Sequence, residues 1–385
     1  MSTPSSRLVV ESSSRRGDSL EDSKTRRLDD LRPTYAEISL GAFERNVDAI
    51  ASRLAPGTRL IALLKADAYG HGAVALAGRC SPEKVAMIGV ALLEEALELR
   101  RAGIPFPILV LGPLNEVQVR IAIENDVTLG VPGPEELEHV ARVARERDVA
   151  IHLKIDSGMG RMGVVETELP DVVELIRSAP RLRVDAIYTH FANAGDPRDP
   201  FTGEQLARFN TLVETLREAG VSAPKHHAAN SAATMRGITP GDYVRVGIAL
   251  YGAEAPTEPV MRWRTEIARL KELPPGHAIG YGTTFFTKRA SRIATLPVGY
   301  ADGYNRRLSN RAEVLVRGRR APVVGRVSMD LVTIDVTDIE DAELGDEVVL
   351  LGDGITAEEL AAKLDTISYE VLCNVSKRVP RLYRE

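Results

Sequence analysis

The sequence of 385 residues predicts an α/β protein with an N-terminal (β/α)8 TIM-like barrel and a C-terminal, mostly β domain. Between residues 59 and 252, eight short apolar runs alternate with amphipathic ones, which is typical of a parallel sheet covered by helices. Eight such units match a closed barrel. After about residue 263, short strand-like runs divided by Pro and Gly replace this alternation. We therefore expect a disordered tail at 1–32, the barrel at 33–262 and the β-rich domain at 263–385.

Most of the predicted barrel strands are continuous apolar runs, as expected for strands buried on both faces. The first strand leads into a short glycine-containing helix, and most of the others lead into longer segments with helical periodicity. The predicted strands are 59–65, 84–90, 107–112, 127–131, 149–155, 183–190, 225–230 and 243–252. The longer helices are predicted at 91–103, 115–126, 134–148, 168–178 and 203–220.

The C-terminal part contains β-branched and apolar runs that are too short for helices. The segment 358–364, EELAAKL, is its one clear helical pattern. The predicted strand-like runs are 268–274, 291–300, 313–318, 319–336 and 346–352.

Composition limits the classes of partner. The 49 basic and 54 acidic residues are well mixed, so the net charge of −5 argues against nucleic acid or an anionic membrane as the partner. No apolar run has membrane-spanning length, and the first 31 residues lack the hydrophobic segment of a secretory signal. The two cysteines are far apart and no metal-binding spacing occurs. We expect a cytoplasmic protein that binds a small molecule and no metal.

Residues 158–163, GMGRMG, match the G-x-G-x-x-G pattern of dinucleotide-binding folds. An apolar strand precedes them, as that fold requires. The following VVETELP, with its β-branched pair and Pro170, is a poor start for a helix. The pattern therefore leaves two interpretations open, a pyrophosphate site and a tight turn.

Reactive groups of a barrel come from the C-terminal ends of its strands. Lys65 ends the first strand, where desolvation would lower its pKa and leave an amine that reacts with carbonyls, although a lysine snorkelling to solvent is an equal alternative. Gly247 would admit backbone N–H groups to a phosphate, unless it marks a strand bulge. The other candidates at strand ends are Lys154, Arg161, His190, Asn230, Ser231, Arg245 and Ile248.

An amine, a phosphate cradle and buried cations are the components of a pyridoxal phosphate site. At this point the sequence, from about residue 33 onward, resembles alanine racemase, a fold-type III pyridoxal phosphate enzyme. The resemblance rests on ten motifs in the family's order: ALLKADAYGHG, LKIDSGMGRMG, YTHFA, FTGEQLARF, HAANSAA, VRVGIALYG, IGYGTTF, LPVGYADG, APVVGRVSMD and TISYEV.

The resemblance implies a role for each matching residue. Lys65 would bind the cofactor covalently and act as the base facing D-alanine, and Tyr281 would be the base facing L-alanine. Arg245, backed by His190, would face the pyridine nitrogen. The phosphate would be held by Tyr69, Ser231, Gly247, Ile248 and Tyr369, with Asn230 beside them.

Further residues would serve the substrate. Arg161 and the backbone of Met329 would hold its carboxylate, with Lys154 carbamylated to orient Arg161 and with Tyr300 and Asp330 in support. Tyr281 and Met329 would reach the cofactor of a second subunit, so a homodimer is implied. The implied activity is racemisation of L- and D-alanine, which supplies D-alanine for peptidoglycan.

Three other functions remain to be weighed. A dinucleotide oxidoreductase would rest on residues 158–163 alone. A non-catalytic pyridoxal phosphate carrier would resemble the barrel but lack the second domain. A related decarboxylase would carry a cysteine-based motif in place of IGYG, and Cys373 lies outside such a context. The breadth of amino-acid specificity, alanine against serine and others, stays open.

Overall fold

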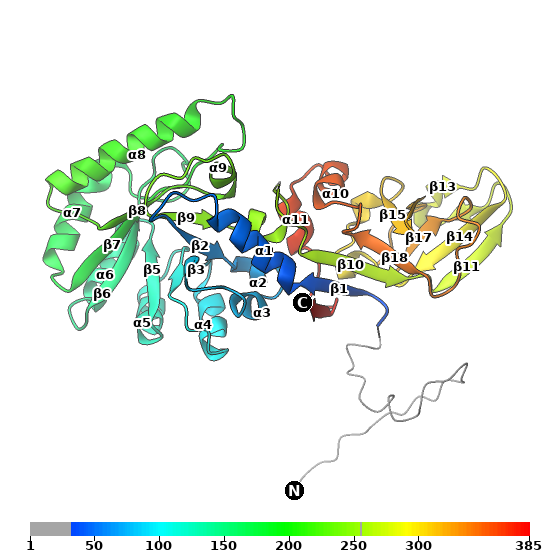
Figure 1. The fold of residues 1–385 in the computed structure, drawn as a ribbon, viewed down its shortest axis with the longest axis horizontal. Helices are drawn as coiled ribbons and strands as arrows, with labels where there is room; N and C mark the ends of the chain where they lie inside the picture. The colour runs from blue at the N-terminus through cyan, green and yellow to red at the C-terminus, as the bar shows by residue number, and fades with distance from the viewer. Residues whose placement is uncertain (1–31, 255) are drawn as a thin grey trace, which may run out of the picture. The chain divides into compact units, whose positions relative to one another are not determined.

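A computed structural model describes residues 32–254 and 256–385. Eight parallel strands form a closed barrel, which confirms the predicted fold class (Figure 1). β9 pairs with β2 and so closes the barrel. The barrel strands are β2 (Arg59–Leu63), β3 (Val85–Val90), β4 (Ile108–Val110), β5 (Val127–Val131), β6 (Val149–Lys154), β7 (Leu182–Tyr188), β8 (Lys225–His227) and β9 (Tyr243–Val246). The predicted tail at 1–32 lies outside the described residues except for Arg32.

Helices follow the barrel strands and turn their apolar faces inward. In α4, for example, Leu93, Ala96 and Leu99 share one face and are buried. No helix in the described part of the chain is long and apolar enough to cross a membrane. The helical elements of the barrel region are α1 (Leu40–Ala51), α2 (Lys65–Gly70), α3 (Ala73–Ala77), α4 (Leu93–Arg101), α5 (Glu116–Glu124), α6 (Pro134–Val143), η3 (Glu166–Glu168), α7 (Leu169–Ser178), α8 (Phe201–Glu218), α9 (Ser231–Met235) and η4 (Ile248–Tyr251).

The C-terminal part is mostly β, as predicted. Its main sheet has six strands in the order β16-β15-β18-β10-β1-β19, and smaller sheets join β11-β14-β17 and β12-β13. Its strands are β10 (Met261–Glu266), β11 (Arg269–Leu273), β12 (Ala278–Ile279), β13 (Phe285–Phe286), β14 (Ser291–Leu296), β15 (Glu313–Val316), β16 (Arg319–Pro322), β17 (Val332–Asp335), β18 (Glu347–Leu351) and β19 (Arg381–Arg384). Its helical elements are η5 (Tyr281–Thr283), η6 (Tyr300–Asp302), η7 (Arg306–Leu308), α10 (Ala357–Leu364) and α11 (Ser368–Cys373).

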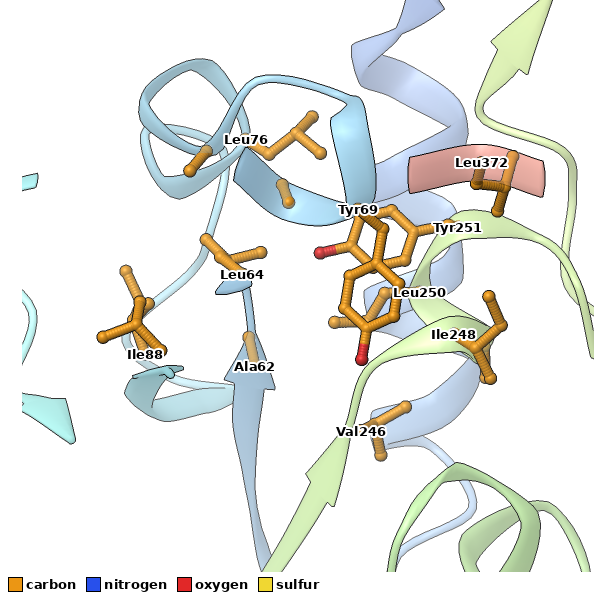
Figure 2. Close-up of a cluster of buried hydrophobic side chains, with 14 of the residues drawn as sticks. Ala62, Leu64, Tyr69, Leu76, Ile88, Val246, Ile248, Leu250, Tyr251 and Leu372 are labelled. Carbon is orange, nitrogen blue, oxygen red and sulfur yellow. The ribbon is translucent and has the colours of Figure 1, made fainter. Parts of the chain in front are cut away.

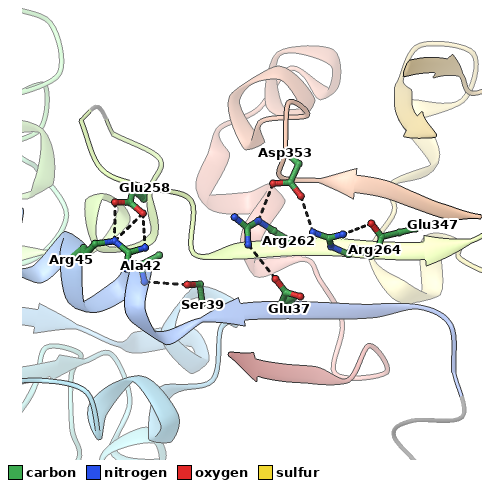
Figure 3. Close-up of polar contacts among 9 residues, drawn as sticks. All are labelled: Glu37, Ser39, Ala42, Arg45, Glu258, Arg262, Arg264, Glu347 and Asp353. Carbon is green, nitrogen blue, oxygen red and sulfur yellow. Dashed lines mark hydrogen bonds and ion pairs between the residues drawn. The ribbon is translucent and has the colours of Figure 1, made fainter. Parts of the chain in front are cut away.

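The strand β1 (Tyr35–Ser39) belongs to the C-terminal sheet, although the predicted domain range of 33–262 includes it with the barrel. It pairs antiparallel with β10 and parallel with β19, because its alternating buried residues Ala36 and Ile38 match that sheet. Ser39 ends β1 and accepts a hydrogen bond from the N–H of Ala42, which starts α1 (Figure 3). The chain therefore passes from the six-stranded sheet of the C-terminal part, through α1, into the barrel.

Ion pairs join β1, β10 and the turn after β18. Arg262 contacts both Glu37 and Asp353, and Arg264 contacts Asp353 and Glu347 (Figure 3). Most of these side chains are partly exposed, so each pair adds no more than about 1 kcal/mol. Burial of the apolar strand faces contributes more to holding this sheet together.

Candidate active site

Lys65 lies just after β2 and begins an unusual turn. The next four residues, 66–69, all have φ between 52° and 54°, which is the left-handed region. For residues other than glycine this conformation costs roughly 1–2 kcal/mol each. The turn therefore needs specific contacts to hold it.

Polar groups from several elements hold the left-handed turn. The Nδ1–H of His71 lies 2.9 Å from the carbonyl of Ala68 and 3.0 Å from that of Tyr69. The carboxylate of Asp67 accepts from the N–H of Ala73, and that of Glu95 accepts from the N–H of Ala66. These contacts fix the backbone on which Lys65 and Tyr69 stand.

The ammonium group of Lys65 is mostly removed from water. This desolvation lowers its pKa, and the positive charge of Arg161 lowers it further. The helix α11 packs against the same turn, because a Cβ on Gly70 would stand 2.8 Å from the carbonyl oxygen of Leu372. Lys65 thus has more neutral amine near neutral pH than an exposed lysine would, which favours a nucleophile or base.

A cradle of small groups lies where β9 ends. Ser231 Oγ accepts a hydrogen bond of 3.0 Å from the N–H of Gly247. A Cβ on Gly247 would stand 2.3 Å from the hydroxyl of Tyr69, so only glycine fits there. Tyr69 in turn lies against Tyr369 of α11, with ring centroids 5.8 Å apart. The structure therefore brings together four residues proposed to hold a phosphate.

Buried aromatic packing supports this cradle. Tyr69 and Tyr251 lie side by side, with centroids 4.8 Å apart, between α2 and the chain that follows β9 (Figure 2). Ile248 packs beside them in the same cluster. Asn230 accepts a hydrogen bond from the N–H of Ala233 and so caps the N-terminus of α9. The hydroxyl of Ser231 is left for the cradle.

Arg245 is 2 % exposed and is bound on one side by five acceptors. Its Nη1 contacts Nδ1 of His227 at 2.7 Å, and its Nη2 contacts Nδ1 of His190 at 3.2 Å. The carbonyls of Thr189, His227 and Ala228 also accept from Nη1 and Nη2, with one N–H of Nη2 shared between acceptors. Burial lowers the pKa of the guanidinium to about 10, so it remains charged near pH 7. None of these hydrogen bonds uses Nε, which remains a donor for a ligand.

The glycine motif forms a tight turn around a carboxylate. Asp156 accepts hydrogen bonds of 2.8 Å from the N–H groups of Gly158, Met159 and Gly160. These amides are among those that a dinucleotide pyrophosphate would need, and here they bind a carboxylate of the protein itself. Arg161 extends from the same turn with an exposed side chain.

Lys154 ends β6 beside this turn and is 6 % exposed. Burial and the positive charges of Arg161 and Arg245 lower its pKa to about 8. His190 lies in the same group of charges, and burial together with Arg245, Lys154, Arg161 and Lys65 lowers its pKa to about 3. The barrel mouth is therefore strongly positive, which suits a ligand that carries phosphate and carboxylate groups.

The remaining candidates gather on turns of the C-terminal part. The N–H of Tyr300 donates to Ser328 and that of Ala301 to the carbonyl of Met329, both at 3.0 Å. The neighbouring Asp330 binds Arg378. Within residues 32–254 and 256–385, no hydrogen bond uses the N–H of Met329, so it is free for a carboxylate.

Tyr281 lies on a turn packed against the same segment. A Cβ on Gly280 would be 3.1 Å from the N–H nitrogen of Arg326, three residues before Met329. Tyr281 is 73 % exposed and Met329 is 53 % exposed. Both side chains are therefore largely open to solvent on their own chain.

His227 is a site residue that the sequence analysis missed. Adjacent histidines on a strand point to opposite faces, so His226 and His227 looked like ordinary core or surface residues. In the structure His227 is fully buried and makes the shortest side-chain contact to Arg245. Its position three residues before the end of the predicted strand 225–230 was too weak a signal to identify it.

Comparisons with known proteins cover almost the whole chain. Residues 38–255 match the family model "Alanine racemase, N-terminal domain", and residues 260–383 match "Alanine racemase, C-terminal domain". The chain is 42% identical over 368 residues to an alanine racemase of Halothermothrix orenii, which covers 92% of this chain and 97% of that protein. It is 43% identical over 373 residues to one of Symbiobacterium thermophilum, covering 92% and 98%.

A solved structure agrees with this relationship. The alanine racemase of Bacillus anthracis, solved with L-Ala-P bound, matches with a TM-score of 0.86 at 38% identity, over 92% of this chain and 96% of that one. Family models, relatives and solved structure all extend through both the barrel and the β-rich part. The chain therefore belongs to the alanine racemase family and is an enzyme of the racemase class.

Proposed function

We propose that this protein interconverts L- and D-alanine with pyridoxal phosphate held at the C-terminal end of the barrel. One observation carries the proposal: a desolvated lysine, Lys65, lies among a hydroxyl and amide cradle and a buried arginine. A phosphate-binding barrel without catalysis would not need the C-terminal turns that carry Tyr281 and Met329.

The residues present fit this cofactor. Tyr69, Ser231, Tyr369 and the N–H groups of Gly247 and Ile248 would hold its phosphate, and the Cβ clash at Gly247 supports close backbone approach. Arg245 would donate its free Nε–H to the ring nitrogen. A guanidinium does not readily give up a proton, so it would keep that nitrogen unprotonated. When bound, the cofactor would withdraw electrons from the substrate's α-carbon and acidify its α-proton.

Two bases would handle that proton. Racemisation needs one acid/base group on each face of the α-carbon. Lys65 would serve the face from which D-alanine loses its proton, and the phenol of Tyr281 the face for L-alanine. Because Tyr281 and Met329 are exposed on their own chain, we propose that they complete the site of a second copy in a homodimer.

Arg161 and the N–H of Met329 would hold the substrate carboxylate. We propose that Lys154 is carbamylated, because a carbamate would pair with Arg161, whereas an ammonium repels it. The lowered pKa of Lys154 supports this, since only a neutral amine reacts with carbon dioxide. Tyr300 and Asp330 would keep the Met329 turn in place.

The test is to load the full-length protein with pyridoxal phosphate and follow racemisation of L- and D-alanine. A violet absorbance band that borohydride abolishes would indicate attachment to a lysine, and Lys65→Ala should lose both the band and the activity. Racemisation rates with L-serine and other small amino acids would define specificity. A loaded protein that leaves L-alanine unchanged would contradict the proposal. The proposed setting is the cytoplasm, where the product would supply D-alanine for peptidoglycan.

A further inference from the structure

The hydrogen-bond network of Arg245 continues into the barrel interior. Nδ1 of His227 contacts Arg245, and its Nε2 lies 3.0 Å from Nδ1 of His152 on β6. His227 and His152 are 0 % and 3 % exposed. Three side chains from three strands thus form one line from the proposed ring-nitrogen site toward the opposite end of the barrel.

The chemistry of these groups allows one arrangement of protons. A guanidinium only donates, so Nδ1 of His227 must accept and its proton must be on Nε2. That Nε2–H donates to His152, so Nδ1 of His152 must also accept and its proton must be on its own Nε2. A proton on both nitrogens of His227 would place two N–H groups face to face at 2.7 Å.

The surroundings keep both imidazoles neutral. Burial lowers the pKa of His152 to about 4, with Asp185 opposing this shift and Arg245 and Lys225 adding to it. Burial, Arg245, His152 and His226 lower the pKa of His227 well below its usual range. The ring of Tyr188 stacks on that of His227, with ring centroids 4.7 Å apart and an interplanar angle of 6°. This stacking holds the His227 ring in the orientation in which it contacts both Arg245 and His152.

The outer end of the line reaches a cavity. His152 lines it together with Thr128, Asp185, Lys225 and Tyr243 from neighbouring strands. Thr128, Lys225 and Tyr243 lie at or next to the first residue of their strands, at the end of the barrel away from Lys65 and Gly247, whereas His152 and Asp185 lie in the middle of theirs. The line of three side chains therefore connects this cavity to Arg245 in the barrel interior.

We propose that His152 is a positioning residue for Arg245: by accepting from His227 it fixes the histidine tautomer that presents a lone pair to the guanidinium. This inference rests on the proposed function in one respect, because the contact of Arg245 with the cofactor ring is part of that proposal. Without His152, the Nε2–H of His227 is buried without an acceptor. His227 can then rotate or change tautomer, and Arg245 loses one of the contacts that aim its Nε.

The first test measures the tautomers directly. Nitrogen-15 NMR of histidine side chains in the full-length protein, with and without pyridoxal phosphate, should show His152 and His227 neutral and protonated on Nε2. An Nδ1–H or a charged form of His227 at neutral pH would overturn the proposal. This measurement does not depend on activity, so failure of the wild-type protein to racemise alanine would contradict the proposed function alone.

The second test uses two substitutions of nearly equal size. The carbonyl oxygen of Asn in His152→Asn can take the place of Nδ1 as acceptor, whereas His152→Leu offers none. We expect His152→Leu to lower kcat for alanine about tenfold, with less than about a twofold change in KM. The nitrogen-15 resonances of His227 should broaden, because its two tautomers would exchange. His152→Asn should retain sharp His227 resonances and stay within about threefold of wild-type kcat. Equal kcat in both variants would overturn the proposal.

Discussion

At the level of single residues, strand ends suggested many residues of the candidate site, the family resemblance suggested others, and buried contacts added His227. Lys65 and Arg245 became candidates because burying a cation within an apolar run costs free energy unless other groups compensate for it. His227 could not be found in this way, because its importance comes from its 2.7 Å contact with a residue on the next strand. A sequence shows which residues carry chemistry but not which neighbour each one meets across a barrel.

Tyr281 allows a sharp test of the two-base assignment. Tyr281→Phe removes only the hydroxyl, so the cofactor absorbance should persist while racemisation falls by roughly 100-fold or more. Exchange of the α-proton should be lost more from L-alanine than from D-alanine, because Lys65 still serves the other face. The measurement is racemisation by polarimetry together with α-proton exchange in deuterium oxide.

Tyr35→Phe is a matched control, since Tyr35 lies on β1 and carries no proposed role. It should behave as wild type in both assays. Equal losses of exchange from L- and D-alanine in Tyr281→Phe would contradict the assignment of one base to each face.

The proposed carbamate on Lys154 can be tested by mass. The intact mass of the native protein should exceed that of the sequence by one carbon dioxide, because the neutral amine is accessible near pH 7 and Arg161 stabilises the carbamate. Removing carbon dioxide and bicarbonate should lower activity, and adding bicarbonate should restore it. Lys154→Met should show neither the added mass nor the bicarbonate response. A native mass equal to the sequence mass would refute the carbamate.

At the level of elements, most of the barrel strands were predictable because each is a short apolar run with a helix after it, although β8, with the sequence KHH, is not apolar. The left-handed turn at 66–69 was not, since ADAY has no glycine to signal a positive φ, and the turn depends on His71, Glu95 and Asp67. The run 319–336 looked like one continuous strand. It is divided into β16 and β17 by Gly325, whose φ of 76° allows the turn that presents Met329.

Gly247, which lies between β9 and η4, allows a test of the packing of the proposed phosphate cradle. In Gly247→Ala the new methyl would stand 2.3 Å from the Tyr69 hydroxyl, so Tyr69 or the backbone must move. We expect the Kd for pyridoxal phosphate to rise at least about tenfold and stability to fall by about 1–3 kcal/mol. Gly203→Ala is the control, because a Cβ there meets nothing within 4 Å and α8 should gain up to about 1 kcal/mol. Unchanged affinity in Gly247→Ala would show that the cradle is not used.

At the level of the whole molecule, the sequence predicted two parts but not how the chain passes between them. β1, β10 and β19 come from distant segments and meet in one sheet, and short strands of this kind carry little local signal. The same limit applies to the site. The sequence suggests Tyr281 and a second subunit only through the family resemblance, and the exposure of Tyr281 on its own chain supports that expectation independently.

A mixed dimer would decide whether the site is shared between subunits. Lys65→Ala and Tyr281→Phe should each be nearly inactive alone. If each site takes Lys65 from one chain and Tyr281 from the other, a dimer with one chain of each kind has one site with both substitutions and one intact site. Random assembly at equal amounts gives half mixed dimers, so about a quarter of wild-type activity should return after the two proteins are unfolded and refolded together. A site built within one chain would recover nothing, because every chain in the mixture lacks one of the two bases.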